Sequence, residues 1–191
     1  MEKEFHNHMR IPWHDYTRKS LGHPITEASL SEKASIIGRT GIMLLSCGTG
    51  AWRVRSSMNT LARELGITCT ADIGLLSIEY TCIAGGDCYT ESLCLFNTGV
   101  NTSKLYRMEE FVNKFAGNCK KMSGDELHTL LDRIHEIHGF YSPPFLGLAA
   151  AVACCAFTFL LGGGPVEMFC AFLGAGAGNY LRAKMNQHHL T

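Results

Sequence analysis

Two stretches near the start of the chain carry apolar residues at helical spacing. Residues 31–48 are apolar along most of their length, and Ser29 or Ser31 can cap the helix that they predict. Residues 51–66 place apolar side chains three and four positions apart and end on Gly66, a residue type favoured just beyond a helix. The sequence therefore predicts two consecutive helices with a short glycine-containing break between them.

The next three stretches have the composition of β-strands. Residues 67–73, 75–83 and 88–96 are rich in isoleucine, threonine, tyrosine and cysteine, and the second and third alternate between apolar and polar positions. Gly85 and Gly86 can supply the positive φ angles of a tight hairpin turn. We expect an antiparallel meander of three strands.

Two further helices are predicted after the strands. Residues 102–117 present one apolar face, and Ser123 with Glu126 forms a capping box for a helix over residues 125–137. The order helix, helix, three strands, helix, helix is typical of an α+β domain.

A long uncharged stretch follows this domain. No charged side chain occurs between Gly139 and Val166, and residues 143–164 supply the roughly 20 apolar residues that cross a bilayer as a helix. A glycine-rich break at residues 162–165 separates it from a second apolar stretch. We expect a transmembrane helical hairpin; the alternative is a pair of buried helices in a soluble core.

The basic residues indicate how such a hairpin would be oriented. Lys120, Lys121 and Arg133 precede the first span and Arg182 and Lys184 follow the second, whereas the connecting turn has no basic residue. Because basic residues favour the cytoplasmic side, both flanks are expected there. The predicted organisation is an irregular leader (1–30), a cytoplasmic α+β domain (31–139), a transmembrane hairpin (140–185) and a tail (186–191).

Charge and cysteine content bear on the partners and the cellular compartment of the protein. Lysine plus arginine equals aspartate plus glutamate at 17 each, so no overall field favours nucleic acid as a partner. The nine cysteines are irregularly spaced without a CxxC pair, and the charged N-terminus does not resemble a signal peptide. We expect free thiols in a reducing compartment.

No cofactor, metal site or catalytic constellation is predicted. The leader histidines lack partners that would complete a metal site, and so do those of the last soluble helix. Asp132 is expected on the outer face of that helix, and Cys47 and Cys88 have no neighbouring base. The leader histidines are His6, His8 and His14, and the helix histidines are His128, His135 and His138.

Four local motifs follow one another along the chain in a distinctive order. They are CGTGAWRVRSSMNTLARELG, EYTCIAGGDCYTES, FNTGVNTSKLYRMEEF and a proline-led apolar span. From about Glu32 to Lys184 the chain resembles the threonine/serine exporter family, specifically its N-terminal-half subunits. That resemblance implies a bacterial inner-membrane exporter of threonine and serine, or of a dicarboxylate such as succinate. It also implies a second small membrane subunit as partner, contact with membrane lipid, and homo- or hetero-oligomers.

The chain also differs from the usual family pattern in two respects. Members with this architecture carry more spans, so we expect either a chain truncated after two membrane spans or a shortened member. Carboxylates usual in the first motif are replaced by Gly50 and Arg55. The hydrolase-like activity suggested for the family's soluble domain is therefore not expected, and the chain is predicted not to be an enzyme. A membrane-tethered enzyme and a regulatory or assembly module remain the alternatives.

Positions that match the family give the candidate site residues. Arg53, Thr81 and Asn101 are predicted to bind substrate, Arg53 because a guanidinium pairs with a carboxylate; a solvated surface arginine is the alternative. Gly48 and Gly99 are predicted structural positions, although an anion-binding loop at residues 48–50 is also open. Gly174 and Gly178 are predicted to allow close helix packing, or to line a solute path.

Overall fold

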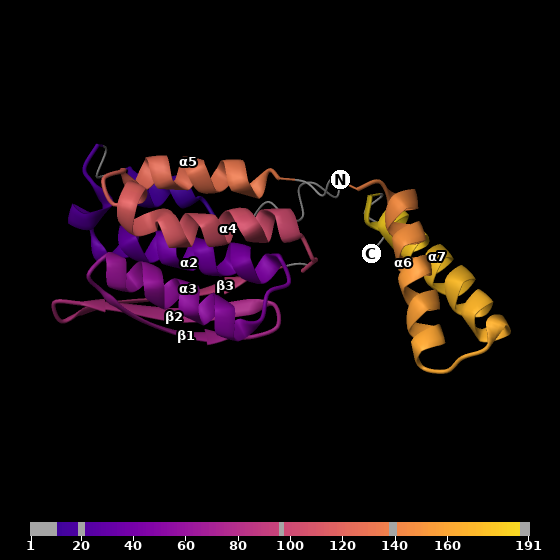
Figure 1. Ribbon diagram of the computed structural model, residues 1–191. Coiled ribbons are helices and arrows are strands. Elements are labelled where there is room, and N and C mark those ends of the chain that lie inside the picture. Colours follow the sequence, from indigo (N-terminus) through magenta and orange to yellow (C-terminus); the bar gives the residue numbers. More distant parts are fainter. Residues whose placement is uncertain (1–10, 19–21, 96–97, 138–140, 188–191) are drawn as a thin grey trace. The chain divides into compact units, whose positions relative to one another are not determined.

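The computed structural model describes residues 11–18, 22–95, 98–137 and 141–187. Contacts within the chain divide it into two units, Met1–His138 and Gly139–Thr191. The first unit contains the predicted α+β arrangement, and the second is a helical hairpin (Figure 1).

The elements of the first unit follow the predicted order. They are the short helices η2 (Trp13–Thr17) and η3 (Ile25–Glu27), the helices α2 (Leu30–Ser46) and α3 (Ala51–Glu64), the strands β1 (Thr68–Ile73), β2 (Ser77–Ala84) and β3 (Asp87–Cys94), the helix α4 (Thr102–Lys114), a π-helical turn η4 (Phe115–Cys119) and the helix α5 (Gly124–His135).

Local chemistry explains where these elements begin and end. The Ser29 hydroxyl accepts a hydrogen bond from the Glu32 amide at the start of α2, and Ser123 and Glu126 form the predicted capping box of α5. Gly66 ends α3 with φ +70°, and a glycine adopts this angle without a Cβ clash.

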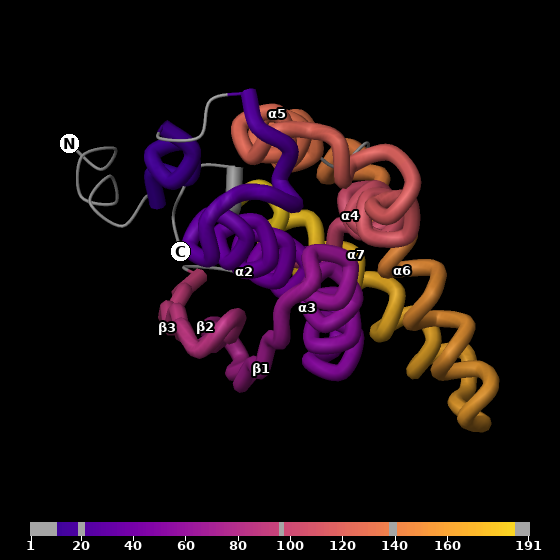
Figure 2. Tube along the Cα trace, turned by 90° about the vertical axis from the view of Figure 1, so that its left-hand side faces the viewer, coloured from indigo at the N-terminus to yellow at the C-terminus, as the bar shows by residue number. Residues whose placement is uncertain are grey.

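The first unit has three layers (Figures 1 and 2). The sheet lies on one side, α2 and α3 cover one of its faces, and α4 and α5 pack over those helices. Because α2 is enclosed on both sides, its residues from Ala34 to Leu45 are buried. Gly38 and Gly41 leave room for Tyr80 and Met58, whose side chains would collide with an added Cβ.

The sheet has the order β1–β2–β3 and is antiparallel throughout. Side chains such as Ile78, Tyr80 and Leu93 point into the core from one face. The opposite face carries a row of threonines, Thr70, Thr81 and Thr90, in register across all three strands.

The described part of the predicted leader is more ordered than an irregular arm. Thr17 in η2 and Ile25 in η3 are buried, and the Ile25 amide donates to the Met122 carbonyl at 2.9 Å. His6 and His8 lie outside the described residues.

The second unit pairs α6 (Pro143–Leu160) with α7 (Pro165–Gln187) in an antiparallel hairpin. The two helices approach closely where an added Cβ on Gly147 would lie 3.0 Å from the Gly176 carbonyl, and one on Gly176 would lie 3.0 Å from Ala151. The Asn179 side chain donates to the Leu146 carbonyl at 3.1 Å.

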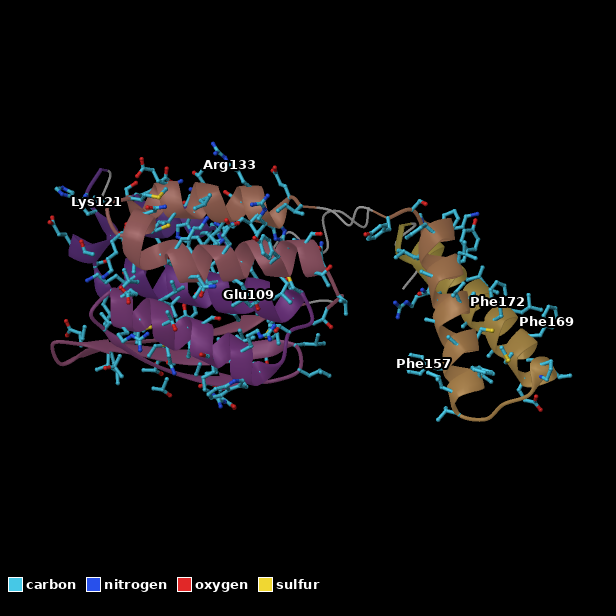
Figure 3. The ribbon with its side chains drawn as sticks, in the orientation of Figure 1. Glu109, Lys121, Arg133, Phe157, Phe169 and Phe172 are labelled. Carbon is cyan, nitrogen blue, oxygen red and sulfur yellow. The ribbon has the colours of Figure 1, made fainter. Side chains whose placement is uncertain are left out.

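Most apolar side chains of the hairpin are exposed. Figure 3 shows Phe157 on α6 and Phe169 on α7 pointing away from the helix pair. Among the described residues, α6 is the helix long and apolar enough to cross a membrane; α7 is longer but less apolar. Two complete spans therefore stay a prediction.

Candidate functional site

A buried arginine lies at the centre of the first unit's main polar cluster. The Arg39 side chain on α2 is 5% exposed and forms an ion pair with Asp132 on α5. Its Nη1 donates to the His128 carbonyl at 3.0 Å, and its guanidinium carbon lies 5.7 Å from the centre of the Trp13 ring. Burial lowers the pKa of Arg39 and Asp132 opposes that effect. A buried charge needs such partners because it has left water.

His128 is fully buried beside this cation and is held neutral. Arg39 Nη1 lies 3.2 Å from His128 Nδ1, and a guanidinium can donate but not accept. Nδ1 is therefore the accepting nitrogen, and Nε2–H donates to the Ser35 hydroxyl at 3.1 Å. Burial, followed by the charges of Arg39 and His14, lowers the pKa of His128 to about 3.

His14 joins η2 to α5 through two carboxylates. Its Nδ1 lies 2.6 Å from Asp125 and its Nε2 lies 2.8 Å from Asp132. Both ring nitrogens face acceptors, which suits a doubly protonated ring, and these hydrogen bonds raise the pKa of His14. Burial opposes ionisation of Asp132, but the bonds from His14 and Arg39 outweigh it and lower the pKa of Asp132.

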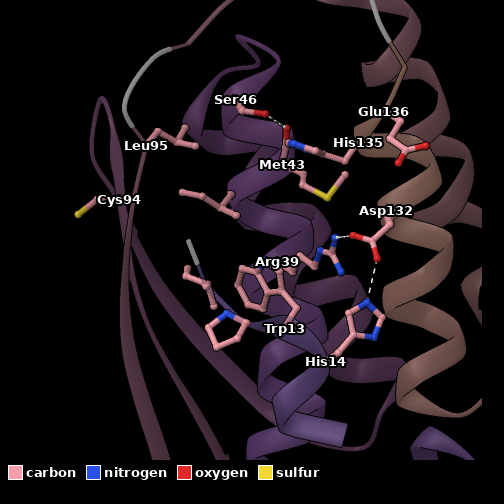
Figure 4. A pocket seen from close by; sticks show the side chains of 13 residues that line it. Trp13, His14, Arg39, Met43, Ser46, Cys94, Leu95, Asp132, His135 and Glu136 are labelled. Atoms are coloured by element: carbon pink, nitrogen blue, oxygen red, sulfur yellow. Dashed lines mark hydrogen bonds and ion pairs between the residues drawn. The ribbon is translucent and has the colours of Figure 1, made fainter. Parts of the chain in front are cut away.

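This polar cluster forms one wall of an open groove of about 760 Å³ (Figure 4). Trp13 and Met43 contribute apolar surface, and the α5 side contributes Asp132, His135 and Glu136. The groove combines apolar surface with charges of both signs, because Arg39 and His14 lie beside Asp132 and Glu136.

The groove shows no assembled nucleophile among the described residues. The Ser46 hydroxyl donates to the Met43 carbonyl at 2.7 Å. Within the described ranges, no group of three or more histidine, cysteine, aspartate or glutamate side chains is placed to hold a metal.

Several predicted site residues gather at one end of the first unit. Gly48, with φ +77°, packs against Val100, and the Gly99 amide donates to the Ser46 carbonyl at 3.1 Å. Asn101 caps α4 by accepting from the Lys104 amide, and its side-chain nitrogen donates to the Ile137 carbonyl at 3.2 Å.

The other two residues predicted to bind substrate, Arg53 and Thr81, lie on α3 and on the sheet. Arg53, in the first turn of α3, pairs with Glu109 on α4 at 3.0 Å and is exposed. Thr81 shares a 2.8 Å hydrogen bond with Thr90 on the open face of the sheet, away from the helices. The structure thus brings Gly48, Gly99 and Asn101 together, while Thr81 lies on another surface.

Comparison with known proteins then gives the family. The model of the family described as "putative threonine/serine exporter" matches residues 35–191. The chain belongs to this family. The match includes Arg39, His128 and Asp132, the first unit from residue 35 onward and the whole second unit, whereas Trp13 and His14 precede it. No curated protein and no solved structure matches the chain.

The polar cluster around Arg39 was not predicted from the sequence. Asp132 was expected on the outer face of its helix, but it is half-exposed and pairs with the buried Arg39. The pairing could not be predicted because helix spacing alone does not show that η2 packs beside α5. Arg39 itself, a charge inside an otherwise apolar helix, was the available signal.

Proposed function

We propose that this chain forms the cytoplasmic domain and membrane hairpin of an inner-membrane exporter of small hydrophilic solutes, with threonine and serine as the first candidates. The observation that carries the proposal is the family match, which extends through the soluble unit and the apolar helix α6. Membership in an exporter family favours transport over catalysis.

The hairpin needs partners to form a pathway, because two helices cannot enclose a polar solute. Gly174 and Gly178 on α7 have no atom within 4 Å of an added Cβ, so the same side of that helix is open along one turn. Small residues of this kind allow another helix to approach closely in lipid. The partner is a second, small membrane subunit or another copy of this chain.

The soluble unit supplies two places for a solute. Arg53 would bind a carboxylate by exchanging its present partner Glu109, with Asn101 at the same end of the unit. The groove beside Arg39 is lined by charges of both signs, Arg39 and His14 against Asp132 and Glu136. Threonine and serine likewise carry both charges, whereas succinate carries only carboxylates, so the amino acids are the first candidates.

The test is efflux from cells of the native bacterium with and without the gene. Cells are loaded with threonine, serine or succinate, and release is followed after transfer to solute-free medium. We expect deletion to slow threonine or serine release and wild-type complementation to restore it. Val152→Arg, which places a charge on the exposed surface of α6, should fail to restore it, while the surface variant Lys121→Ala should succeed.

Unchanged pools and unchanged release of all three solutes after deletion would contradict the exporter proposal. Slower release of succinate alone would retain an exporter but reject the amino acids as its solutes.

A further inference from the structure

The exposed large apolar side chains of the first unit gather mainly at one end. Those described are Trp52, Leu75, Leu76, Ile83, Val100 and Tyr106, with Trp52, Leu75 and Val100 between 78% and 85% exposed. All but Ile83 belong to the segments that meet where α2 ends and α3 and α4 begin. We call this surface, made by Trp52, Leu75, Leu76, Val100 and Tyr106, the linker end.

Hydrogen bonds show that these segments converge. The Leu95 amide donates to the Leu76 carbonyl at 2.7 Å, which ties the β1–β2 turn to the end of β3. The Gly99 amide donates to the Ser46 carbonyl at 3.1 Å, which ties the segment before α4 to the end of α2. Val100 itself packs against Gly48, two residues before α3 begins.

The chain leaves the first unit at the same end. Asn101 donates to the carbonyl of Ile137, two residues after α5 ends. Residues 138–142 alone connect Ile137 to Pro143, the first residue of α6. Even fully extended, this connection reaches on the order of 20 Å. An α6 helix in the membrane therefore keeps the linker end close to the bilayer surface, whatever the angle between the units.

The residue types suit a lipid surface. Tryptophan and tyrosine favour the membrane–water interface, where an apolar ring and a polar atom find their preferred surroundings together. The first two turns of α3 and α4 carry Arg53, Arg55, Lys104 and Arg107. Arg53 and Arg107 pair with Glu109 and Glu110 of the following turn of α4, so Arg55 and Lys104 contribute most of the positive charge. Basic residues beside an apolar surface favour the anionic headgroups of a cytoplasmic leaflet.

We infer that the linker end rests on the cytoplasmic surface of the membrane, with Trp52, Leu75 and Val100 entering the lipid headgroup region. The inference rests on the membrane insertion of α6 in the proposed function and adds a fixed orientation of the soluble unit. Its occupant is lipid, not a second protein.

Tryptophan fluorescence in proteoliposomes tests this contact, because the chain has two tryptophans. The full chain is reconstituted into vesicles of phosphatidylethanolamine with a minority of phosphatidylglycerol, with or without lipids brominated near the headgroup. Trp13→Phe leaves Trp52 as the reporter, and Trp52→Phe leaves Trp13 in the groove as the matched control. A third variant combines both replacements with Phe157→Trp to report on the insertion of α6.

We expect the Trp52 reporter to emit at shorter wavelength than a tryptophan in water and to be strongly quenched by the brominated lipids. The brominated lipids should not quench the Trp13 reporter. A quenched Phe157→Trp reporter with an unquenched Trp52 reporter would overturn the linker-end contact and leave the exporter proposal intact. A blue shift of Trp52 without quenching would also overturn it, because a protein surface would then cover the residue. If no reporter is quenched, insertion of α6 fails, and the lipid contact fails with it.

Discussion

At the residue scale, removing Arg39 and removing Asp132 should destabilise the fold to different extents, although the two residues form one ion pair. The Arg39 side chain is 5% exposed, whereas that of Asp132 is 46% exposed and also bonded to His14. Removing Asp132 strands a buried cation, but removing Arg39 leaves an acid that water and His14 can still solvate. The more exposed partner is therefore the more costly one to remove.

We predict that Asp132→Asn lowers the free energy of unfolding by about 3 kcal/mol and Arg39→Met by only about 1–2 kcal/mol. Denaturant unfolding of the full chain in detergent, followed by Trp13 fluorescence in a Trp52→Phe background, measures both. The exposed pair Arg53–Glu109 provides the control, since Glu109→Gln should cost less than about 0.5 kcal/mol. A larger loss for Arg39→Met than for Asp132→Asn would contradict the assignment.

His14 should make the attachment of η2 sensitive to pH. The charged or titratable groups that face it are Asp125, Asp132, Arg39 and His128. The two carboxylates raise the pKa of His14 above the value of about 6.5 expected in the unfolded chain. Its contribution is therefore complete below about pH 6.5 and is lost as the pH rises through the raised pKa.

Trp13, which lies next to His14 in η2, reports this attachment. In the Trp52→Phe variant we predict that Trp13 emission shifts to longer wavelength as the pH rises above about 6.5 and through the raised pKa of His14. His14→Gln should remove that titration. A shift to longer wavelength as the pH falls below about 6.5, or a titration unchanged by His14→Gln, would show that another group controls it.

At the element scale, the two faces of α7 have different neighbours. Gly176 packs against Ala151 of α6, while Gly174 and Gly178 have open space beside them. We predict that Gly174→Ile with Gly178→Ile leaves the hairpin folded but blocks its association with another helix. Cross-linking of the full chain in membranes measures this loss.

Ala149→Ile is the matched control, since it adds similar bulk to an exposed position on α6. Cross-linked species that persist in the glycine variant, or that are lost equally in the control, would mean that Gly174 and Gly178 do not mark the docking surface.

The helices α2 to α5 and the three strands of the first unit could be predicted from sequence, whereas the short helices η2 and η3 could not. Capping at Ser123 and the turn at Gly85 and Gly86 depend on neighbouring residues, so local patterns were sufficient. The three-strand order followed because short turns join consecutive antiparallel strands.

The candidate site could not be predicted in the same way. The cluster joins His14 from η2, Arg39 from α2 and Asp132 from α5, which lie far apart in sequence. No local pattern encodes that meeting. The roles of Arg53, Thr81 and Asn101 in substrate binding came from the family resemblance and stay predictions.

At the scale of the whole molecule, the chain combines a folded α+β unit with a hairpin whose apolar side chains are mostly outside. The first unit buries its apolar side chains in its own core. The exposed apolar surface of α6 requires lipid or protein around it. Everything proposed for this chain requires that the hairpin cross the membrane while the first unit stays in the cytoplasm.

Cysteine labelling in intact cells tests that requirement most directly. The cysteines outside the buried set, Cys88, Cys94, Cys154, Cys155 and Cys170, are first replaced by serine. Leu161→Cys, at the exposed end of α6, and Lys121→Cys, on the surface of the first unit, are then compared using a membrane-impermeant maleimide. We predict that Leu161→Cys reacts in intact cells and that Lys121→Cys reacts only after the cells are opened. Reaction of both sites only in opened cells, or of Lys121→Cys in intact cells, would contradict the membrane hairpin with a cytoplasmic domain.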